Sequence, residues 1–218
     1  MNMRSMVALA GVALIGVSLN AAAVDNPTGF YAGGGLGLAK ADKTACDELD
    51  RTVSPTFSSQ VNCDDQDVAW KLFVGWQPIK WAGIEAGFLD LGKLTAKGGA
   101  TDVSAKVDGG FIAATFTVPM LEQVGFYGKG GVYIWDGELG GTISSIGPIP
   151  TIKDDDSSGF FGFGFRFPLG ERFGMRLEYE RYLDIGPPGS IPTPSGPFQF
   201  GAGQSDVDYF SVHGLFSF

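Results

Sequence analysis

Apolar and polar side chains alternate along this chain in segments of about ten residues, and a period of two predicts β-strands with two different faces. The clearest segment is "VAWKLFVGWQ" at 68–77. One of its faces consists of Val68, Trp70, Leu72, Val74 and Trp76, and the other of Ala69, Lys71, Phe73, Gly75 and Gln77. A second segment at 158–167 carries Phe161, Phe163, Phe165 and Phe167 on one face, and Gly162, Gly164 and Arg166 on the other.

Eight such segments are predicted, at 29–40, 67–77, 81–91, 105–118, 125–135, 158–167, 173–184 and 206–218. Three of their connections are tight turns, whereas four are long and polar, around 41–66, 92–104, 136–157 and 185–205. Alternating strands with short turns on one side and long loops on the other are typical of outer-membrane barrels. The chain is therefore expected to be all-β: an eight-stranded antiparallel up-and-down transmembrane β-barrel with a polar, side-chain-filled lumen, its turns and both termini periplasmic and its loops outside.

The alternation also decides which side chains face lipid. If the bulky apolar rows face outward, nine titratable residues face the lumen: Lys71, Glu85, Asp108, Lys129, Arg166, Arg176, Glu178, Glu180 and His213. The opposite orientation would place such cations in hydrocarbon, at about 2–4 kcal/mol each near the midplane. With histidine neutral, four positive and four negative groups balance inside the lumen. The segment at 105–118, which contains Asp108, alternates least clearly.

The N-terminus predicts export. Arg4 precedes a mostly apolar run at 7–19, and Ala21–Ala23 supplies small residues for cleavage, so residues 1–23 are expected to be a signal peptide and 24–218 the barrel domain. Because an exported protein reaches an oxidising compartment, Cys46 and Cys63 are predicted to form a disulfide in the first long loop. The formal net charge of −9 makes nucleic acid an unsuitable partner.

The sequence contains no recognisable catalytic or metal-binding pattern. His213 is the single histidine, and Ser211 lies two residues away on the same face, so their side chains stand roughly 6–7 Å apart along a strand. Carboxylates gather in the predicted loops, as in "DDD" at 154–156, but without EF-hand spacing, which favours a solvated surface over a metal site. No enzyme, metal or cofactor is expected. A lipid A-modifying enzyme and a soluble lipocalin-like barrel are the alternatives from other classes.

Several stretches together resemble the OmpA-like eight-stranded barrel family of Gram-negative outer membranes. They include "GFYAGGGLGLA" at 29–39, "WAGIEAGFLDLG" at 81–92, "GFYGKGGVYIWD" at 125–136 and "MRLEYERYLDIG" at 175–186. The resemblance implies a lumen salt-bridge network whose counterparts here are Glu85, Lys129, Arg176 and Glu178. It also implies that the closing strand, with Phe210, Val212, Phe216 and Phe218, is an insertion signal for the barrel-assembly machinery. No peptidoglycan-binding domain is expected, because nothing follows the last strand.

These features predict a structural or surface-interaction role, in envelope integrity or in adhesion through the loops. A small gated pore is the alternative, in which Glu85 and Lys129 exchange partners. The expected partners are outer-membrane lipid and lipopolysaccharide, and a host or surface ligand of unknown identity; the barrel is expected to be a monomer. Arg181, at the outer end of its strand, is a candidate contact for lipopolysaccharide phosphates, with pairing to a nearby loop acid as the alternative.

Overall fold

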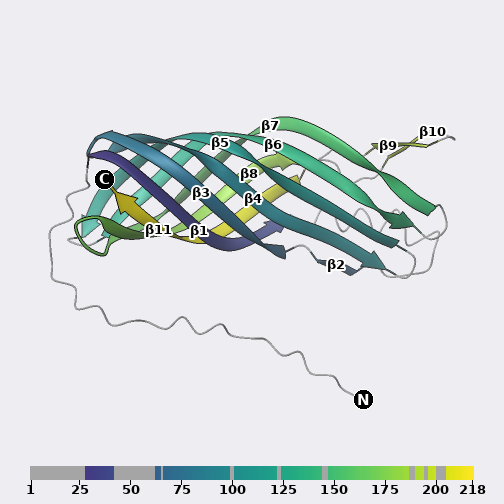
Figure 1. Cartoon of the computed structure of the whole chain (residues 1–218), viewed down its shortest axis with the longest axis horizontal. Coiled ribbons are helices and arrows are strands. Elements are labelled where there is room, and N and C mark those ends of the chain that lie inside the picture. Colours follow the sequence, from purple (N-terminus) through teal and green to yellow (C-terminus); the bar gives the residue numbers. More distant parts are fainter. Residues whose placement is uncertain are drawn as a thin grey trace, which may run out of the picture.

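A computed structural model describes residues 28–41, 62–64, 66–98, 101–121, 124–143, 147–186, 190–193, 196–199 and 205–218. Eight long strands form the barrel in Figure 1: β1 (Gly29–Ala41), β3 (Gln66–Ile79), β4 (Ala82–Gly98), β5 (Thr101–Leu121), β6 (Val124–Ile143), β7 (Gly147–Pro168), β8 (Phe173–Ile185) and β11 (Ser205–Ser217). Three short strands lie between them: β2 (Asn62–Asp64), β9 (Ser190–Thr193) and β10 (Gly196–Gln199).

The sheet closes on itself. Each long strand pairs antiparallel with its neighbours along the chain, and β1 pairs with β11 from Tyr31 opposite Ser217 to Ala41 opposite Val207. All backbone groups of a membrane-spanning sheet need partners, and closure removes the unpaired edges. The predicted fold class is therefore confirmed. In the part of the chain that the structure describes, no helix has the length and apolar character needed to cross a membrane.

The predicted orientation of the two faces is also correct. Phe161, Phe163 and Phe165 lie on the outer surface with 46%, 47% and 41% of their area exposed. Lys129 and Arg176, in contrast, are buried in the interior at 4% and 1%. The outer surface is thus an apolar belt suited to lipid, and the ionised groups meet inside the barrel.

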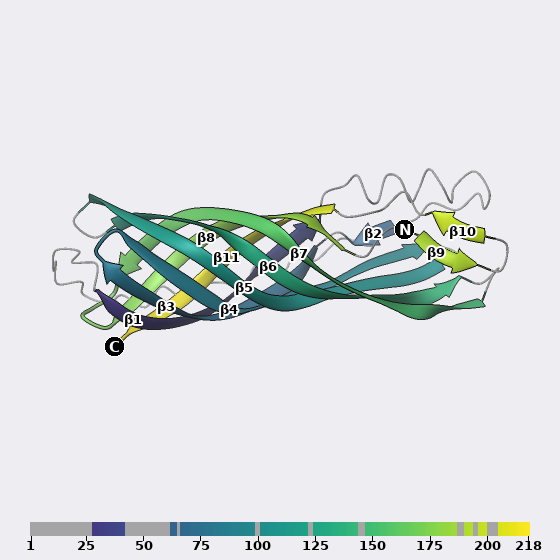
Figure 2. The ribbon, with the colours of Figure 1, turned by 90° about the horizontal axis from the view of Figure 1, so that it is seen from above.

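Four strands continue well beyond the others, which corrects two predicted loops. Strands β5, β6 and β7 have 21, 20 and 22 residues, whereas β1, β8 and β11 have 13 each. Most of the residues predicted as loops at 92–104 and 136–157 are therefore strand. Figure 2 shows β4, β5, β6 and β7 reaching past the ends of β1, β8 and β11. The backbone ladder continues here, with Glu138 opposite Lys153, after the apolar alternation has ended.

The other two long connections hold the short strands. Strand β2 pairs with β4, and β9 pairs with β10 as a separate hairpin. The predicted signal peptide at 1–23 and Cys46 lie outside the described residues, so the signal peptide and the disulfide to Cys63 stay predictions.

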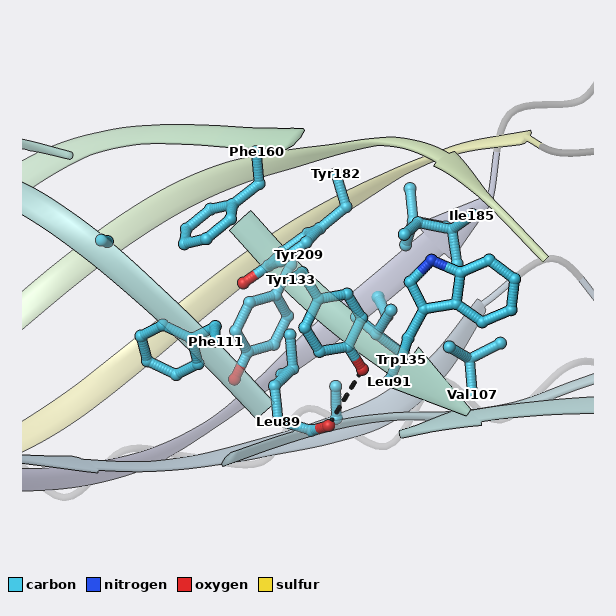
Figure 3. Packing of buried hydrophobic residues seen from close by; sticks show 14 of the residues in the cluster. Leu89, Leu91, Val107, Phe111, Tyr133, Trp135, Phe160, Tyr182, Ile185 and Tyr209 are labelled. Carbon is cyan, nitrogen blue, oxygen red and sulfur yellow. Dashed lines mark hydrogen bonds between the residues drawn. The ribbon is translucent and has the colours of Figure 1, made fainter. Parts of the chain in front are cut away.

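The outer part of a cluster of buried apolar side chains, here called the aromatic layer, fills the outer half of the lumen (Figure 3). Its large members are Leu89, Leu91, Val107, Phe111, Tyr133, Trp135, Phe160, Tyr182, Ile185, Val207 and Tyr209. The rings of Phe160 and Tyr182 stack at a centroid distance of 4.9 Å. Two polar atoms within the layer have partners: Trp135 Nε1 donates to Ser158 Oγ at 2.9 Å, and Tyr133 Oη donates to the carbonyl oxygen of Leu89 at 3.1 Å. The layer closes the lumen toward the outside.

Candidate functional site

Below the aromatic layer lies a group of six charged side chains, here called the ion-pair layer. Its members are Lys71 on β3, Glu85 on β4, Lys129 on β6, and Arg176, Glu178 and Glu180 on β8. Each points inward because it occupies the lumen-facing parity of its strand. Their side chains are at most 1% exposed, so each charge depends on a partner within the barrel.

Lys129 is the centre of this layer. Its Nζ lies 2.7 Å from Glu178 Oε1, 2.7 Å from Glu180 Oε1 and 3.7 Å from Glu85 Oε2. Lys71 Nζ pairs with Glu180 Oε2 and also lies 3.0 Å from the hydroxyl of Tyr182. One ammonium therefore connects all three carboxylates, and the second reinforces Glu180 at the boundary with the aromatic layer.

Arg176 completes the layer on the periplasmic side. Its Nη1 donates to Glu85 Oε1 at 2.6 Å, and its Nη2 lies 3.4 Å from Glu178 Oε2. Aromatic rings cover the guanidinium, whose Cζ lies 4.5 Å from the ring centroid of Phe73 and 4.2 Å from that of Tyr127. Such contacts favour a desolvated guanidinium because the ring faces carry negative charge density.

Two other predicted lumen residues are not members of the ion-pair layer: His213 contacts its edge, and Arg166 lies outside it. His213 Nδ1 is 3.3 Å from Glu178 Oε2, and the imidazole packs edge-on against Phe73. Arg166 is also inside the barrel but near its periplasmic end, where Nη1 donates to Gln77 Oε1 at 3.3 Å. No carboxylate among the described residues forms an ion pair with Arg166.

The prediction for Asp108 is wrong. The lumen-facing residues of β5 are the odd-numbered Val107, Phe111 and Ala113, so Asp108 points outward. Its Oδ1 lies 3.0 Å from Lys106 Nζ, and the same Nζ lies 3.4 Å from Oδ2 of Asp90 on β4. The physical reason is that Asp108 lies where β5 leaves the apolar belt, so an outward carboxylate is solvated there.

This correction changes the charge balance inside the barrel. Among the described residues, the buried cations are Lys71, Lys129, Arg166 and Arg176, and the buried carboxylates are Glu85, Glu178 and Glu180. With His213 neutral, four positive charges face three negative ones, in place of the predicted balance.

Several tyrosines and one glutamine support the site, although sequence reasoning did not select them. Tyr31 Oη donates to Glu85 Oε1 at 2.8 Å, and Tyr182 Oη to Glu180 Oε1 at 3.0 Å. Gln77 is 3% exposed and holds Arg166. Each of these polar groups has the inward parity of its strand, so the alternation in the sequence could have identified it.

Arg181 lies at the outer end of β8 and pairs with two aspartates. Its Nη2 donates to Asp206 Oδ2 at 2.8 Å and its Nη1 to Asp208 Oδ1 at 3.2 Å, while Tyr179 Oη donates to the same Asp208 oxygen at 2.7 Å. Arg181 is thus paired with nearby acids, but both belong to β11, whereas the alternative placed the acid in a loop. A contact with lipopolysaccharide phosphate stays a prediction.

The last strand has the predicted facing. Phe210, Val212 and Phe218 are on the outer surface at 58%, 50% and 77% exposure, and Phe216 is half-buried against Phe173. The backbone amide of Phe218 donates to the carbonyl oxygen of Phe30 at 3.0 Å, which fixes the end of the strand to β1. Recognition by the assembly machinery stays a prediction.

The described lumen side chains hold charges in pairs. Ser211 and His213 both face the closed interior, at 6% and 0% exposure. Within the described ranges, no group of three or more histidine, cysteine, aspartate or glutamate side chains is arranged to hold a metal ion.

Comparison with known proteins places this barrel among its relatives. The model of the OmpA-like transmembrane domain matches residues 25–195. Outer membrane protein A of Klebsiella pneumoniae is 27% identical over 177 residues, 80% of this chain, and that of Salmonella typhi is 27% identical over 184 residues, 84% of this chain. The chain spans about half the length of these curated relatives, 49% in both cases.

Solved structures show the same fold. Neisserial surface protein A aligns with a TM-score of 0.54 at 11% identity, covering 88% of this chain and 98% of that one. OprG of Pseudomonas aeruginosa aligns with a TM-score of 0.50 at 15% identity, covering 88% and 97%. Together with the closed eight-stranded barrel and its charged lumen, these matches establish that the chain belongs to the OmpA-like transmembrane domain family and resides in the outer membrane of the cell.

Proposed function

We propose that this protein is a non-catalytic structural and surface-contact protein, in which a closed barrel holds an extracellular β-sheet at the cell surface. Two observations together carry this proposal. The ion-pair layer and the aromatic layer both fill the lumen, and strands β4–β7 continue beyond the apolar belt. The closed lumen favours anchoring over transport, and the extended sheet supplies a surface for contact with the envelope or with another cell.

The extended sheet has the properties of a solvated contact surface. Its outward side chains are charged and exposed, including Asp136, Glu138, Lys153 and Asp155. Glu138 pairs with Lys153 across β6 and β7, and this ion pair raises the pKa of the Lys153 ammonium through its hydrogen bond to the carboxylate. A paired sheet presents such groups in a fixed arrangement, which a flexible loop of the same length would not do.

The register of β6 and β7 permits a sharp test. Gly137 lies opposite Asp154, so residues 138–153 can be replaced by an Asn-Gly turn without changing the barrel below. We expect a deletion strain to lose adhesion or detergent resistance. The shortened protein should insert normally and restore detergent resistance, but not adhesion, if the sheet is the contact surface.

A matched control substitutes Arg172 by alanine in an exposed turn at the opposite end of the barrel. This variant should restore both phenotypes. Normal adhesion and normal detergent resistance in the deletion strain, in parallel assays, would contradict the proposal.

A small gated pore is the second candidate, and one observation favours it. Glu85 and Glu178 each contact both Lys129 and Arg176, so these ions can exchange partners while every charge stays paired. Bilayer recordings of the refolded wild type and of Glu85→Ala test this function. Conductance bursts whose frequency changes in the variant would support a gate, whereas closed traces from both proteins would remove the pore hypothesis.

A further inference from the structure

Arg166 is a buried cation without an anionic partner in the described chain. It is 9% exposed, lies close to the periplasmic end of β7, and makes one described hydrogen bond, from Nη1 to Gln77 Oε1 at 3.3 Å. Its Cζ lies 5.6 Å from the ring centroid of Tyr31. A guanidinium has five N–H donors and remains protonated in proteins, so most of its hydrogen-bonding capacity is left for another acceptor.

The surrounding charges increase this imbalance. Arg166 lies directly opposite Arg176 in the pairing of β7 with β8, and like charges at such positions repel each other. The three lumen carboxylates already pair with Lys71, Lys129 and Arg176 in the ion-pair layer. Among the described lumen residues, one positive charge therefore lacks a carboxylate partner at this end of the barrel.

The other inward-facing polar side chains described at this end of the lumen are uncharged. Thr117 at the end of β5 and Ser217 at the end of β11 face inward and are buried at 3% and 8% exposure. Gln77 is held with its Nε2 donating to the carbonyl oxygen of Lys80, which leaves Oε1 for Arg166. Together, Gln77, Thr117, Arg166 and Ser217 are here called the periplasmic mouth.

We propose that the periplasmic mouth binds a small soluble oxyanion of the phosphate or sulfate class, anchored by Arg166. The planar guanidinium offers paired donors that match two oxygens of such an anion, and the hydroxyls of Thr117 and Ser217 supply further donors at the same end. The barrel wall separates Arg166 from the lipid, since the residue has inward parity; the ligand is therefore a dissolved anion and not a lipid headgroup.

The test is an NMR titration of the refolded protein in a detergent that contains no phosphate. Inorganic phosphate or sulfate is added against chloride at constant ionic strength, and the backbone amide shifts of Gly125, Arg166 and Ser217 are followed. The wild type should show saturable shifts that fit one site. Arg166→Gln should weaken binding at least tenfold, whereas Arg172→Gln, in the exposed periplasmic turn, should bind as the wild type does.

Folding of each variant is checked by the mobility difference between heated and unheated samples on gels. If Arg166→Gln does not fold, Arg166→Lys keeps the charge but loses the paired donors, and should bind more weakly than the wild type. Linear shifts without saturation in the wild type, or equal binding by the folded Arg166 variant, would overturn the proposal. A short-chain phosphatidic acid that saturates the same amides while inorganic phosphate does not would also overturn it.

Discussion

Lys129 shows how one side chain holds the closed lumen together. Its ammonium lies within 4 Å of three glutamates that come from two strands. Replacing it with methionine keeps the length of the side chain but leaves those carboxylates with weaker compensation. We expect Lys129→Met to lower the free energy of unfolding by about 3–5 kcal/mol. The measurement is urea unfolding of the protein refolded in lipid vesicles.

The control is Lys153→Met, which removes a lysine from the exposed pair with Glu138. Exposed pairs contribute little to stability because water solvates both charges and salt screens them. The control should therefore unfold as the wild type does. Equal unfolding curves for Lys129→Met and the wild type would show that the ion-pair layer does not stabilise the barrel.

Gly75 is required by a close approach inside the barrel. A Cβ atom at this position would lie 2.2 Å from Tyr31 Cζ and 2.5 Å from its hydroxyl oxygen. Gly75→Ala should displace the ring, break its hydrogen bond to Glu85, and destabilise the protein by about 1–3 kcal/mol. Gly214→Ala is the matched control, since nothing lies within 4 Å of a Cβ there. The same urea series compares the two variants, and similar stabilities would contradict the role of the Tyr31 ring.

At the scale of one strand, β5 shows where sequence reasoning reached its limit. The alternation over Phe111, Ala113 and Thr115 gives little contrast with Ile112, Ala114 and Phe116, because both faces contain apolar residues. The phase of the strand could not be read from polarity alone, and a carboxylate was assigned to the lumen by its chemistry. By contrast, β3 and β7 have most of their large apolar side chains on the outward face, and the facing of both strands was predicted correctly.

The outward position of Asp108 predicts a contrast between two lysine substitutions on one face of β5. Ala114 lies near the middle of the outward row, whereas Asp108 lies at its outer limit. Ala114→Lys should destabilise the protein by about 2–4 kcal/mol, because it places a cation near the midplane of the bilayer. Asp108→Lys should have a much smaller effect. Unfolding in vesicles measures both, and equal losses would place Asp108 within the hydrocarbon.

The outer parts of β4, β5, β6 and β7 were predicted as loops for a related reason. In the membrane, lipid and lumen impose a period of two on the sequence, but beyond the membrane both faces contact water. Segments such as "DGELGGT" at 136–142 then lack alternation, although their backbone groups still pair from strand to strand. The sequence pattern therefore predicts the part of each strand within the apolar belt, but it does not predict where the strands end.

At the scale of the whole molecule, the lumen is closed by two layers in series. The ion-pair layer is held by charges, and the aromatic layer by close packing of large side chains. Inward polarity predicted the first layer in large part. The second was missed because it combines tyrosine, tryptophan and leucine from strands that are distant in sequence, so only the closed register shows that they meet (Figure 3).

Two closures in series make a specific prediction for conductance. Opening the ion-pair layer with Glu85→Ala and Lys129→Ala should leave the aromatic layer closed, and opening the aromatic layer with Trp135→Ala and Phe160→Ala should leave the ion-pair layer closed. Each double variant should therefore stay silent in bilayer recordings, while the folded fourfold variant should conduct. Conductance by either double variant alone would mean that only the layer opened in that variant closes the barrel, and that this single layer separates an anchor from a channel.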